Sequence, residues 1–226
     1  MPSKLIYILC IFTSQCFIAL GQNIRREEIC IKPIFDKTTL QLDKSYYHSG
    51  IKDSISISAF KFYISSIELI QNEKVIWKEE NSFHLIDTDN ETSLSIPLHI
   101  PSDLQYNKIK FNIGIDSVTN TSGAMGGDLD PTKGMYWAWQ SGYINFKLEG
   151  KSTKQEFQFH LGGYQTPFNS LKTISLNLSP NSEKEIYIDI KKLITEIDLT
   201  KQHHIMSPSE ISVLLSQKLA EAFSTY

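Results

Sequence analysis

Apolar residues recur at every second position over much of the chain between residues 55 and 190. Because successive side chains of a β-strand point to opposite faces, this period of two predicts half-buried strands. The cleanest alternation runs from Ile109 to Ile115. The predicted strands cover residues 55–64, 67–69, 94–98, 109–115, 144–148, 157–161, 174–178 and 186–190.

Interruptions of the alternation predict irregularities in three places. The parity of the apolar positions changes between Ala59 and Phe60, which predicts a bulge or bend there. Pro97 lies inside a predicted strand and has no N–H to donate, so that strand should lie at an edge of a sheet or contain a bulge. The turn-forming residues Glu149–Ser152 separate two strands and predict a hairpin.

The C-terminus changes to helical spacing. The run Ser207-Pro208-Ser209-Glu210 predicts an N-cap at Ser207, with proline at the first helical position and glutamate at the third. The apolar residues that follow at helical spacing are Ile211, Leu214, Leu215, Leu219, Ala222 and Phe223. The predicted fold is all-β, an antiparallel β-sandwich with a C-terminal α-helix packed on it. No linker or repeat divides residues 22–226, so we expect one domain.

The first residues have the pattern of a secretory signal peptide. Lys4 precedes the apolar stretch Leu5–Phe12, and small residues at Ala19 and Gly21 place the cut after residue 21. The expected location is therefore the periplasm or the cell exterior. Ser14 and Gln15 are a poor match to the residues that precede a lipidated cysteine, so we expect no lipid anchor at Cys16.

Composition removes several classes of function. A formal net charge of -3 gives no basic excess, so nucleic acid is not an expected partner. Two of the three cysteines lie in the predicted signal peptide, and Cys30 alone would remain in the mature chain. One cysteine can form neither an internal disulfide nor a cysteine-rich metal site. The fold must therefore be held by its hydrophobic core.

An aromatic cluster, Gly134–Tyr143, contains two of the three tryptophans of the chain. In an extended segment Trp137 and Trp139 would point to the same face, together with Met135. Large aromatic side chains at such positions either fill a core or line a site. The pattern alone leaves both interpretations open.

No catalytic signature is present, so we do not expect an enzyme. The sequence lacks the nucleophile elbow, the zinc-protease motif, the phosphate-binding loop and the dinucleotide-binding motif. A glycan hydrolase would need paired carboxylates, for which Asp128, Asp130 and Glu149 are weak candidates. Asp128 and Asp130 also suggest a calcium loop, but the rest of such a loop is missing.

Histidine is the better indication of a metal, since imidazole is the commonest transition-metal ligand. The six histidines are His48, His84, His99, His160, His203 and His204. His99 alternates with apolar residues on a polar face, so we expect it to be exposed. None of the six forms an H-x-H or H-x-x-x-H pair, so spacing alone does not identify a site.

Several motifs in order resemble the MbnP-like copper-binding family. They are F-K-F-Y-I-S-S-I from Phe60, F-H-L-I-D from Phe83, F-N-I-G-I-D-S-V-T-N-T-S-G-A from Phe111, G-D-L-D-P-T-K-G-M-Y-W-A-W-Q-S-G-Y from Gly127, K-L-E-G from Lys147 and F-H-L-G-G from Phe159. The resemblance covers residues 55–163 and, more loosely, H-I-M-S-P from His204.

The resemblance implies a secreted or periplasmic β-rich protein that handles copper and is not an enzyme. Family members bind one copper ion through histidine nitrogens and a tryptophan oxidised to kynurenine. Carried over, the modified residue is Trp137 or Trp139, with a preference for Trp137, and the first histidine ligand is His160. The second is open between His84 and His204. No histidine lies within W-A-W itself.

The same resemblance implies two kinds of partner: a di-haem peroxidase-like enzyme that oxidises the tryptophan, and an outer-membrane TonB-dependent transporter. The competing hypothesis is a metal-free binding or structural domain of the cell envelope that keeps only the fold. Under it, the tryptophans are core residues and His160 is a hydrogen-bonded polar side chain.

Overall fold

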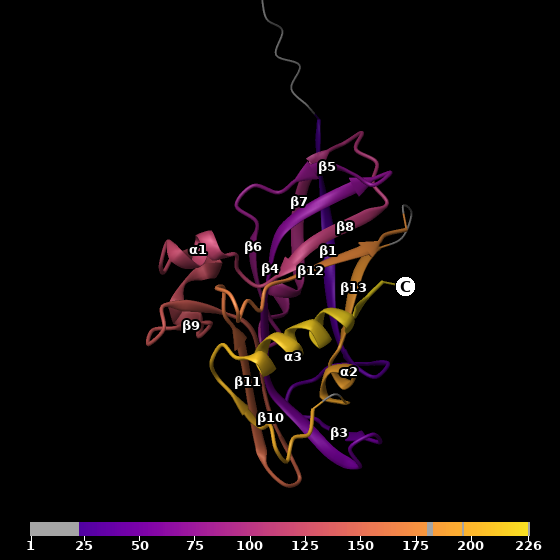
Figure 1. Ribbon diagram of the computed structural model, residues 1–226. Helices are drawn as coiled ribbons and strands as arrows, with labels where there is room; N and C mark the ends of the chain where they lie inside the picture. The colour runs from indigo at the N-terminus through magenta and orange to yellow at the C-terminus, as the bar shows by residue number, and fades with distance from the viewer. Residues whose placement is uncertain (1–22, 180–182, 196, 226) are drawn as a thin grey trace, which may run out of the picture.

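The computed structural model describes residues 23–179, 183–195 and 197–225, so the predicted signal peptide and Cys16 lie outside the described residues. Within these ranges the strands form two sheets (Figure 1). The smaller, five-stranded sheet contains β15 (Phe223–Ser224), β13 (Lys184–Asp189), β1 (Ile24–Phe35) and β2 (Thr38–Thr39) in that order, with β7 (Ser95–Pro101) also paired to β1.

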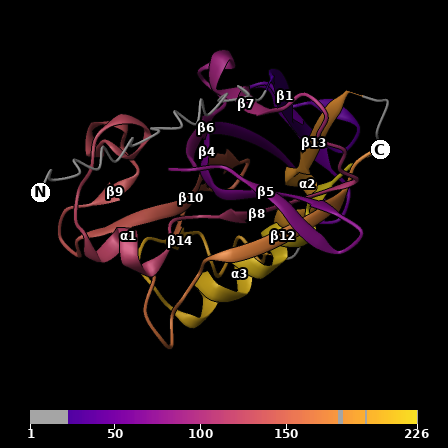
Figure 2. The same cartoon turned by 90° about the horizontal axis from the view of Figure 1, so that it is seen from above.

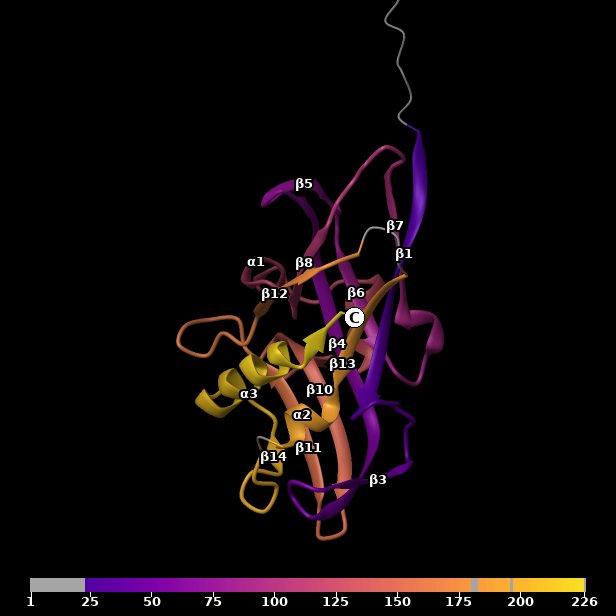
Figure 3. The same ribbon diagram turned by 90° about the vertical axis from the view of Figure 1, so that its right-hand side faces the viewer.

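The larger sheet has ten strands within the described ranges and is built around one long strand, β4 (Asp53–Gln71). Its order is β12 (Lys172–Asn177), β8 (Lys108–Ile113), β4, β10 (Gly142–Ser152), β11 (Glu156–Gly162) and β14 (His204–Ile205). β3 (Ser45–His48), β5 (Lys74–Lys78) and β6 (Phe83–Asp87) also pair with β4, and β9 (Tyr136–Trp137) pairs with β10. β5 and β7 lie at one end of the molecule, and β3 with the β10–β11 turn lies at the other (Figures 1 and 3).

The two sheets share one hydrophobic core, which confirms the predicted sandwich. Phe62 of the large sheet meets Phe223 of the small sheet with ring centroids 5.8 Å apart. Phe60 and Phe146 pack edge to face across β4 and β10 at 5.3 Å. The remaining core residues come from the alternating positions of both sheets. Burying these aromatic and aliphatic side chains stabilises the fold.

A second, smaller core lies on the opposite face of the large sheet. It contains Tyr63, Leu85, Ile115, Leu129, Met135, Trp137, Tyr143 and Ile144. Short elements cover it: α1 (Ser117–Thr121), η2 (Gly127–Leu129), η3 (Pro131–Lys133) and β9. α1 and β9 lie together at one side of the molecule (Figure 2). The aromatic cluster predicted from the sequence is thus part of this outer layer.

Two predicted irregularities are confirmed. Glu149 pairs with Ala59 but Gly150 pairs with Ile57, so Ser58 is the extra residue of a bulge. β7, which carries Pro97, pairs only with β1 among the described strands, and it is therefore an edge strand. The sequence did not predict two parallel pairs, β1 with β13 and β11 with β14. Alternation shows which side chains share a face but not the direction of the neighbouring strand.

The C-terminal helix, α3 (Glu210–Glu221), begins later than predicted. Its N-cap is Ser209, whose hydroxyl accepts a hydrogen bond from Ser212 N at 3.3 Å. The prediction of an N-cap at Ser207 was wrong because the chain is still extended at Ser209. Leu214 is exposed and does not belong to the buried face, which contains Ser212, Leu215, Ser216 and Leu219.

Two short helical elements complete the description: η1 (Glu91–Leu94) and α2 (Ile190–Thr195). Ile190 was predicted as the end of the last strand but begins α2. α3 contacts β11 and β12 and crosses the strands in Figure 1. Within the described ranges, no helix combines the length and the apolar character needed to cross a membrane.

Replacing Ser209 with alanine should lower the free energy of unfolding by about 1 kcal/mol, the usual effect of losing a serine N-cap. The loss should appear as a lower urea midpoint with an unchanged slope. Ser207→Ala is the matched control and should leave the midpoint where it is. A larger effect at Ser207 than at Ser209 would show that the helix begins at the earlier cap.

Candidate metal centre

His160 lies on β11, on the face of the large sheet that carries the smaller core. Its neighbours Phe159 and Leu161 point into the main core, so the imidazole projects from the other side. Lys147 of β10 is its direct partner in the ladder. Only 6% of His160 is exposed. A buried imidazole at this position needs a polar partner.

That partner is Glu149. Nε2 of His160 lies 2.7 Å from Oε1 of the carboxylate. Burial lowers the pKa of His160, and the hydrogen bond to Glu149 opposes the shift only in part. Burial raises the pKa of Glu149, but the hydrogen bond from His160 and the charge of Lys147 more than offset it and leave the value lowered. At neutral pH the pair is thus a neutral imidazole and a carboxylate.

These charge states fix the tautomer of His160. A carboxylate can only accept a hydrogen bond, so Nε2 of the neutral ring must carry the proton. Nδ1 then holds the lone pair. A histidine that donates one N–H to a carboxylate and keeps the other nitrogen as a donor to metal is the usual arrangement in metal sites. The same geometry is also that of a hydrogen-bonded structural histidine.

Trp137 packs against β11 on the face that carries His160. A Cβ on Gly162 would lie 2.6 Å from Cζ3 of the Trp137 ring, so the ring rests directly on this glycine. Gly162 is two residues beyond His160 in β11, and positions two apart in a strand share a face. Trp137 is 6% exposed, and its Nε1 is buried with no hydrogen-bond partner among the described residues.

Trp139 separates from this layer. Met135 and Trp137 are both buried in the smaller core, but Trp139 is 67% exposed. β9 ends at Trp137, so the extended geometry that would have placed Trp139 on the buried face does not continue. Its ring still lies 5.8 Å from that of Trp137, centroid to centroid. The expectation that Trp139 would point to the same face as Met135 and Trp137 was therefore wrong.

Of the two candidates for a second histidine, His204 shares the face of His160. β14 runs parallel to β11, and His204 pairs with Gln158, two residues before His160. Residues paired across a ladder point to the same side of a sheet. His204 is exposed, and its ring lies 4.9 Å from that of His203.

His84 lies elsewhere. It belongs to β6 and pairs with Ile64 of β4, so that β4 and β10 separate it from β11. Its Nε2 lies 2.8 Å from Oε2 of Glu79. Its direct partner Ile64 belongs to the main core, whereas the next residue, Leu85, belongs to the smaller one. His84 and His160 thus project from opposite faces of the large sheet.

Among the described residues, the histidine, cysteine and carboxylate side chains near His160 are too few to form a metal site by themselves. Within residues 23–179, 183–195 and 197–225, no group of three or more histidine, cysteine, aspartate or glutamate side chains is placed to hold a metal ion. Cys30 is a free thiol on β1 of the other sheet. A complete metal centre at His160 therefore requires a donor of another kind.

The other histidines have structural or solvent-exposed positions. His48 is buried, its Nε2 lies 2.9 Å from Oγ1 of Thr195, and its Nδ1 accepts a hydrogen bond from Gly50 N at 3.1 Å. His99 is exposed on β7, as predicted. Neither lies near the His160 face.

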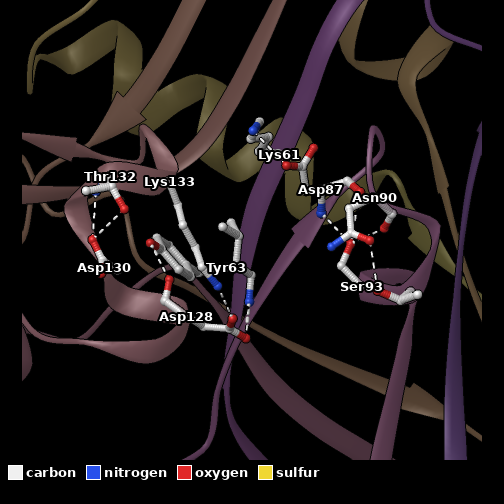
Figure 4. A network of polar contacts seen from close by, with 11 residues as sticks. Lys61, Tyr63, Asp87, Asn90, Ser93, Asp128, Asp130, Thr132 and Lys133 are labelled. Carbon is white, nitrogen blue, oxygen red and sulfur yellow. Dashed lines mark hydrogen bonds and ion pairs between the residues drawn. The ribbon is translucent and has the colours of Figure 1, made fainter.

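The acidic loop forms a polar network beside a cleft of about 430 Å³ (Figure 4). Asp128 Oδ1 lies 2.6 Å from Lys133 Nζ, and its Oδ2 accepts a hydrogen bond from Leu85 N at 3.1 Å. Asp130 caps η3 through Thr132 N, and the hydrogen bonds from Thr132 lower its pKa. These oxygens have protein partners, which favours the turn interpretation of the loop over the calcium one.

Protonation of His160 should make the free energy of unfolding depend on pH. The pKa of His160 lies below 6.5 in the folded chain, so between the two values the unfolded chain binds a proton that the folded chain excludes. Stability should therefore fall as the pH is lowered through 6.5 toward the lower pKa that His160 has in the folded chain. Urea midpoints measured across this range check the sign.

The matched controls are two glutamine variants. His160→Gln should flatten this pH dependence, and His99→Gln, at an exposed position, should retain it. Equal slopes for wild type and His160→Gln would contradict the assignment to His160.

What the sequence could not identify is the environment of His160. Glu149 was a candidate only for hydrolysis, and the contact between Gly162 and Trp137 was not predicted. One feature of the sequence could have indicated this contact. In the two strands of the predicted hairpin, K-L-E and F-H-L alternate so that Glu149 and His160 lie on the same outward face.

Comparison with known proteins identifies relatives of this chain. The MbnP family model matches residues 25–208. Among solved structures, MbnP from Methylosinus trichosporium is similar with a TM-score of 0.54 and 13% sequence identity, over 78% of this chain and 79% of that chain. At this identity the likeness shows the fold alone. The comparison with curated proteins gives no match.

Proposed function

Because the chain belongs to the MbnP family, we propose that it is a copper-binding protein of the periplasm or cell surface without catalytic turnover. One copper ion would be held on the face formed by His160 and Trp137. The predicted signal peptide, residues 1–21, supports the location.

The observation that carries the proposal is the buried position of His160 and the 2.7 Å contact of its Nε2 with Glu149. A buried, neutral imidazole whose Nε2 donates to Glu149 presents Nδ1 as a nitrogen donor. Imidazole nitrogen suits copper in both common oxidation states. Glu149 has the role of orienting the ring and fixing its tautomer. Lys147, 3.3 Å from Glu149, keeps the carboxylate charged.

The second donor would come from Trp137. Indole Nε1–H is a donor only, so an unmodified tryptophan offers no nitrogen lone pair to a metal. Oxidation to kynurenine, which the family resemblance implies, would create an aromatic amine beside His160. Trp137 is favoured over Trp139 because it is buried against Gly162 and its Nε1 lacks a partner among the described residues.

His204 is the preferred second histidine because it shares the face of His160, whereas His84 projects from the opposite face. Bound copper would supply a positively charged Lewis-acid centre to which these donors bind. Two partners complete the proposal. A di-haem peroxidase-like enzyme would oxidise Trp137, and a TonB-dependent transporter would act in the same copper pathway.

The direct test is peptide mass spectrometry of protein isolated from its own host, combined with copper titration. We expect kynurenine at position 137, unmodified tryptophan at 139, and one copper bound more tightly than micromolar. Two unmodified tryptophans together with no copper binding tighter than micromolar would contradict the proposal.

One observation favours the metal-free alternative. Trp137 and Met135 fill the smaller core, and His160 has a hydrogen-bond partner in Glu149. A domain that only needed to fold would show the same two features. Under that alternative, His160→Ala would leave any metal affinity unchanged.

A further inference from the structure

We propose that Asn145 is a positioning residue for the copper site, because it fixes where Trp137 lies relative to His160 and Glu149. This inference rests on the proposed function and deepens it. It adds no ligand to the site but names the side chain that holds the parts of the site in place. Asn145 lies between the motif that ends at Tyr143 and the K-L-E-G motif, and neither of them includes it.

Asn145 is the extra residue of a bulge in β10. Ile144 pairs with Gly162 of β11, but Phe146 pairs with Leu161, so Asn145 has no partner of its own in this ladder. The extra residue changes the alternation of β10. Ile144 belongs to the smaller core and Phe146, two residues later, to the main core. In a regular strand these two side chains would share a face.

The bulge divides β10 into two parts that carry different halves of the site. Trp137 is paired with Gly142, which lies before the bulge. Glu149, the hydrogen-bond partner of His160, lies after it, where β10 is paired with β4 on one side and β11 on the other. The position of Trp137 relative to His160 therefore depends on the conformation of β10 at Asn145.

The side chain of Asn145 is bonded at both ends of its amide and is only 2% exposed. Its Oδ1 accepts a hydrogen bond from Ile115 N, and its Nδ2 donates to Oγ of Ser170, both at 2.9 Å. A backbone N–H can only donate, so the amide oxygen is the atom that faces Ile115. A Cβ on Gly114 would lie 2.3 Å from Cγ of Asn145, so the amide also packs against the backbone there. These contacts hold the side chain in one conformation.

Ser170 connects Asn145 to β11. The Ser170 hydroxyl donates to the carbonyl oxygen of Gly163 at 3.2 Å, and Ser170 N donates to the same oxygen at 3.0 Å. Gly163 directly follows Gly162, the residue on which the ring of Trp137 rests. Asn145 thus holds both the bulge in β10 and the end of β11 that contacts Trp137.

A buried, fully bonded amide would also stabilise a domain that binds nothing, so a loss of stability alone does not identify a role in the site. Ser82 provides the matched control. It is buried, its Oγ accepts a hydrogen bond from Ile67 N at 2.9 Å, and it donates to Glu79 at 2.5 Å. Ser82 directly precedes β6, which pairs with β4 and not with β10 or β11.

The test compares wild type, Asn145→Ala, Ser170→Ala and Ser82→Ala isolated from the native host. Chelator competition gives the copper affinity, peptide mass spectrometry gives the share of residue 137 present as kynurenine, and urea midpoints give the stability. We expect Asn145→Ala to weaken copper binding by about tenfold or more, as for other residues that support a metal ligand, and to lower the share of kynurenine. Ser170→Ala should show a smaller loss of both. Ser82→Ala should lower the urea midpoint and leave both unchanged.

The outcomes separate this inference from the proposed function. If Asn145→Ala lowers the urea midpoint but binds copper as wild type does, Asn145 is only structural and the inference is overturned, while the proposed function stands. If Ser82→Ala loses as much copper affinity as Asn145→Ala, the effect is general destabilisation and the inference is again overturned. If Asn145→Ala does not fold, Ser170→Ala decides by the same two criteria. If wild type binds no copper more tightly than micromolar, the proposed function fails and this inference fails with it.

Discussion

Replacing His160 with glutamine should weaken copper binding by more than about 100-fold, beyond the tenfold to 100-fold range typical of residues that only orient a ligand. The reason is that His160 is the one imidazole both buried on this face and fixed by a carboxylate, within the part of the chain that the structure describes. Glutamine has similar length and can still donate an amide hydrogen bond to Glu149, so the fold should persist. Chelator competition gives the affinity.

Two further variants separate a ligand from its support. Glu149→Gln should lose about tenfold to 100-fold in copper affinity, since it removes the group that fixes the tautomer of His160. His84→Gln should retain wild-type affinity, because His84 bonds Glu79 and projects from the opposite face. Retained affinity in His160→Gln, or a larger loss in His84→Gln, would exclude His160 as the main ligand.

Gly162→Ala should both destabilise the chain and disturb the tryptophan wall of the site. The added Cβ would lie 2.6 Å from Cζ3 of Trp137 and 2.8 Å from the Tyr143 carbonyl oxygen. The carbonyl oxygen belongs to the backbone of β10, and moving it would cost more free energy than moving a side chain. We therefore expect the ring of Trp137 to shift. Overpacking of this kind costs about 1–3 kcal/mol. Urea unfolding measures the loss, and tryptophan fluorescence reports the new environment of the ring.

Gly126→Ala is the matched control, because a Cβ there would have no other atom within 4 Å. It should leave the urea midpoint and the fluorescence unchanged. If Gly162→Ala is as stable as Gly126→Ala, then Trp137 does not rest on β11 as described, and the link between Trp137 and His160 is lost.

The sequence predicted the parts of the fold that depend on which side chains are buried. The alternation in β8 and the change of parity at Ala59 both follow from the need to keep apolar groups in the core. The pattern of buried positions is the same for parallel and antiparallel neighbours, so it did not predict that β11 and β14 are parallel. That pair places His204 on the face of the large sheet that carries His160.

The site was predicted in part. The F-H-L-G-G motif identified His160 as a candidate, and the structure places it in a buried position with its ring against the Glu149 carboxylate. His84 lies in a similar motif, but its side chain projects from the opposite face of the large sheet. The sequence alone does not show this, because the order and register of the strands decide which face a side chain is on. Trp139 was equivalent to Trp137 in the pattern, yet β9 ends between them.

Copper binding as proposed requires that Nδ1 of His160 binds the metal while Nε2 stays protonated. Nitrogen-15 NMR of labelled protein from its own host, recorded before and after one equivalent of Cu(I), observes both nitrogens. We predict that the Nδ1 resonance of His160 shifts on loading and that Nε2 keeps its proton and its bond to Glu149. A Nδ1 resonance that stays in place while copper binds would contradict the account.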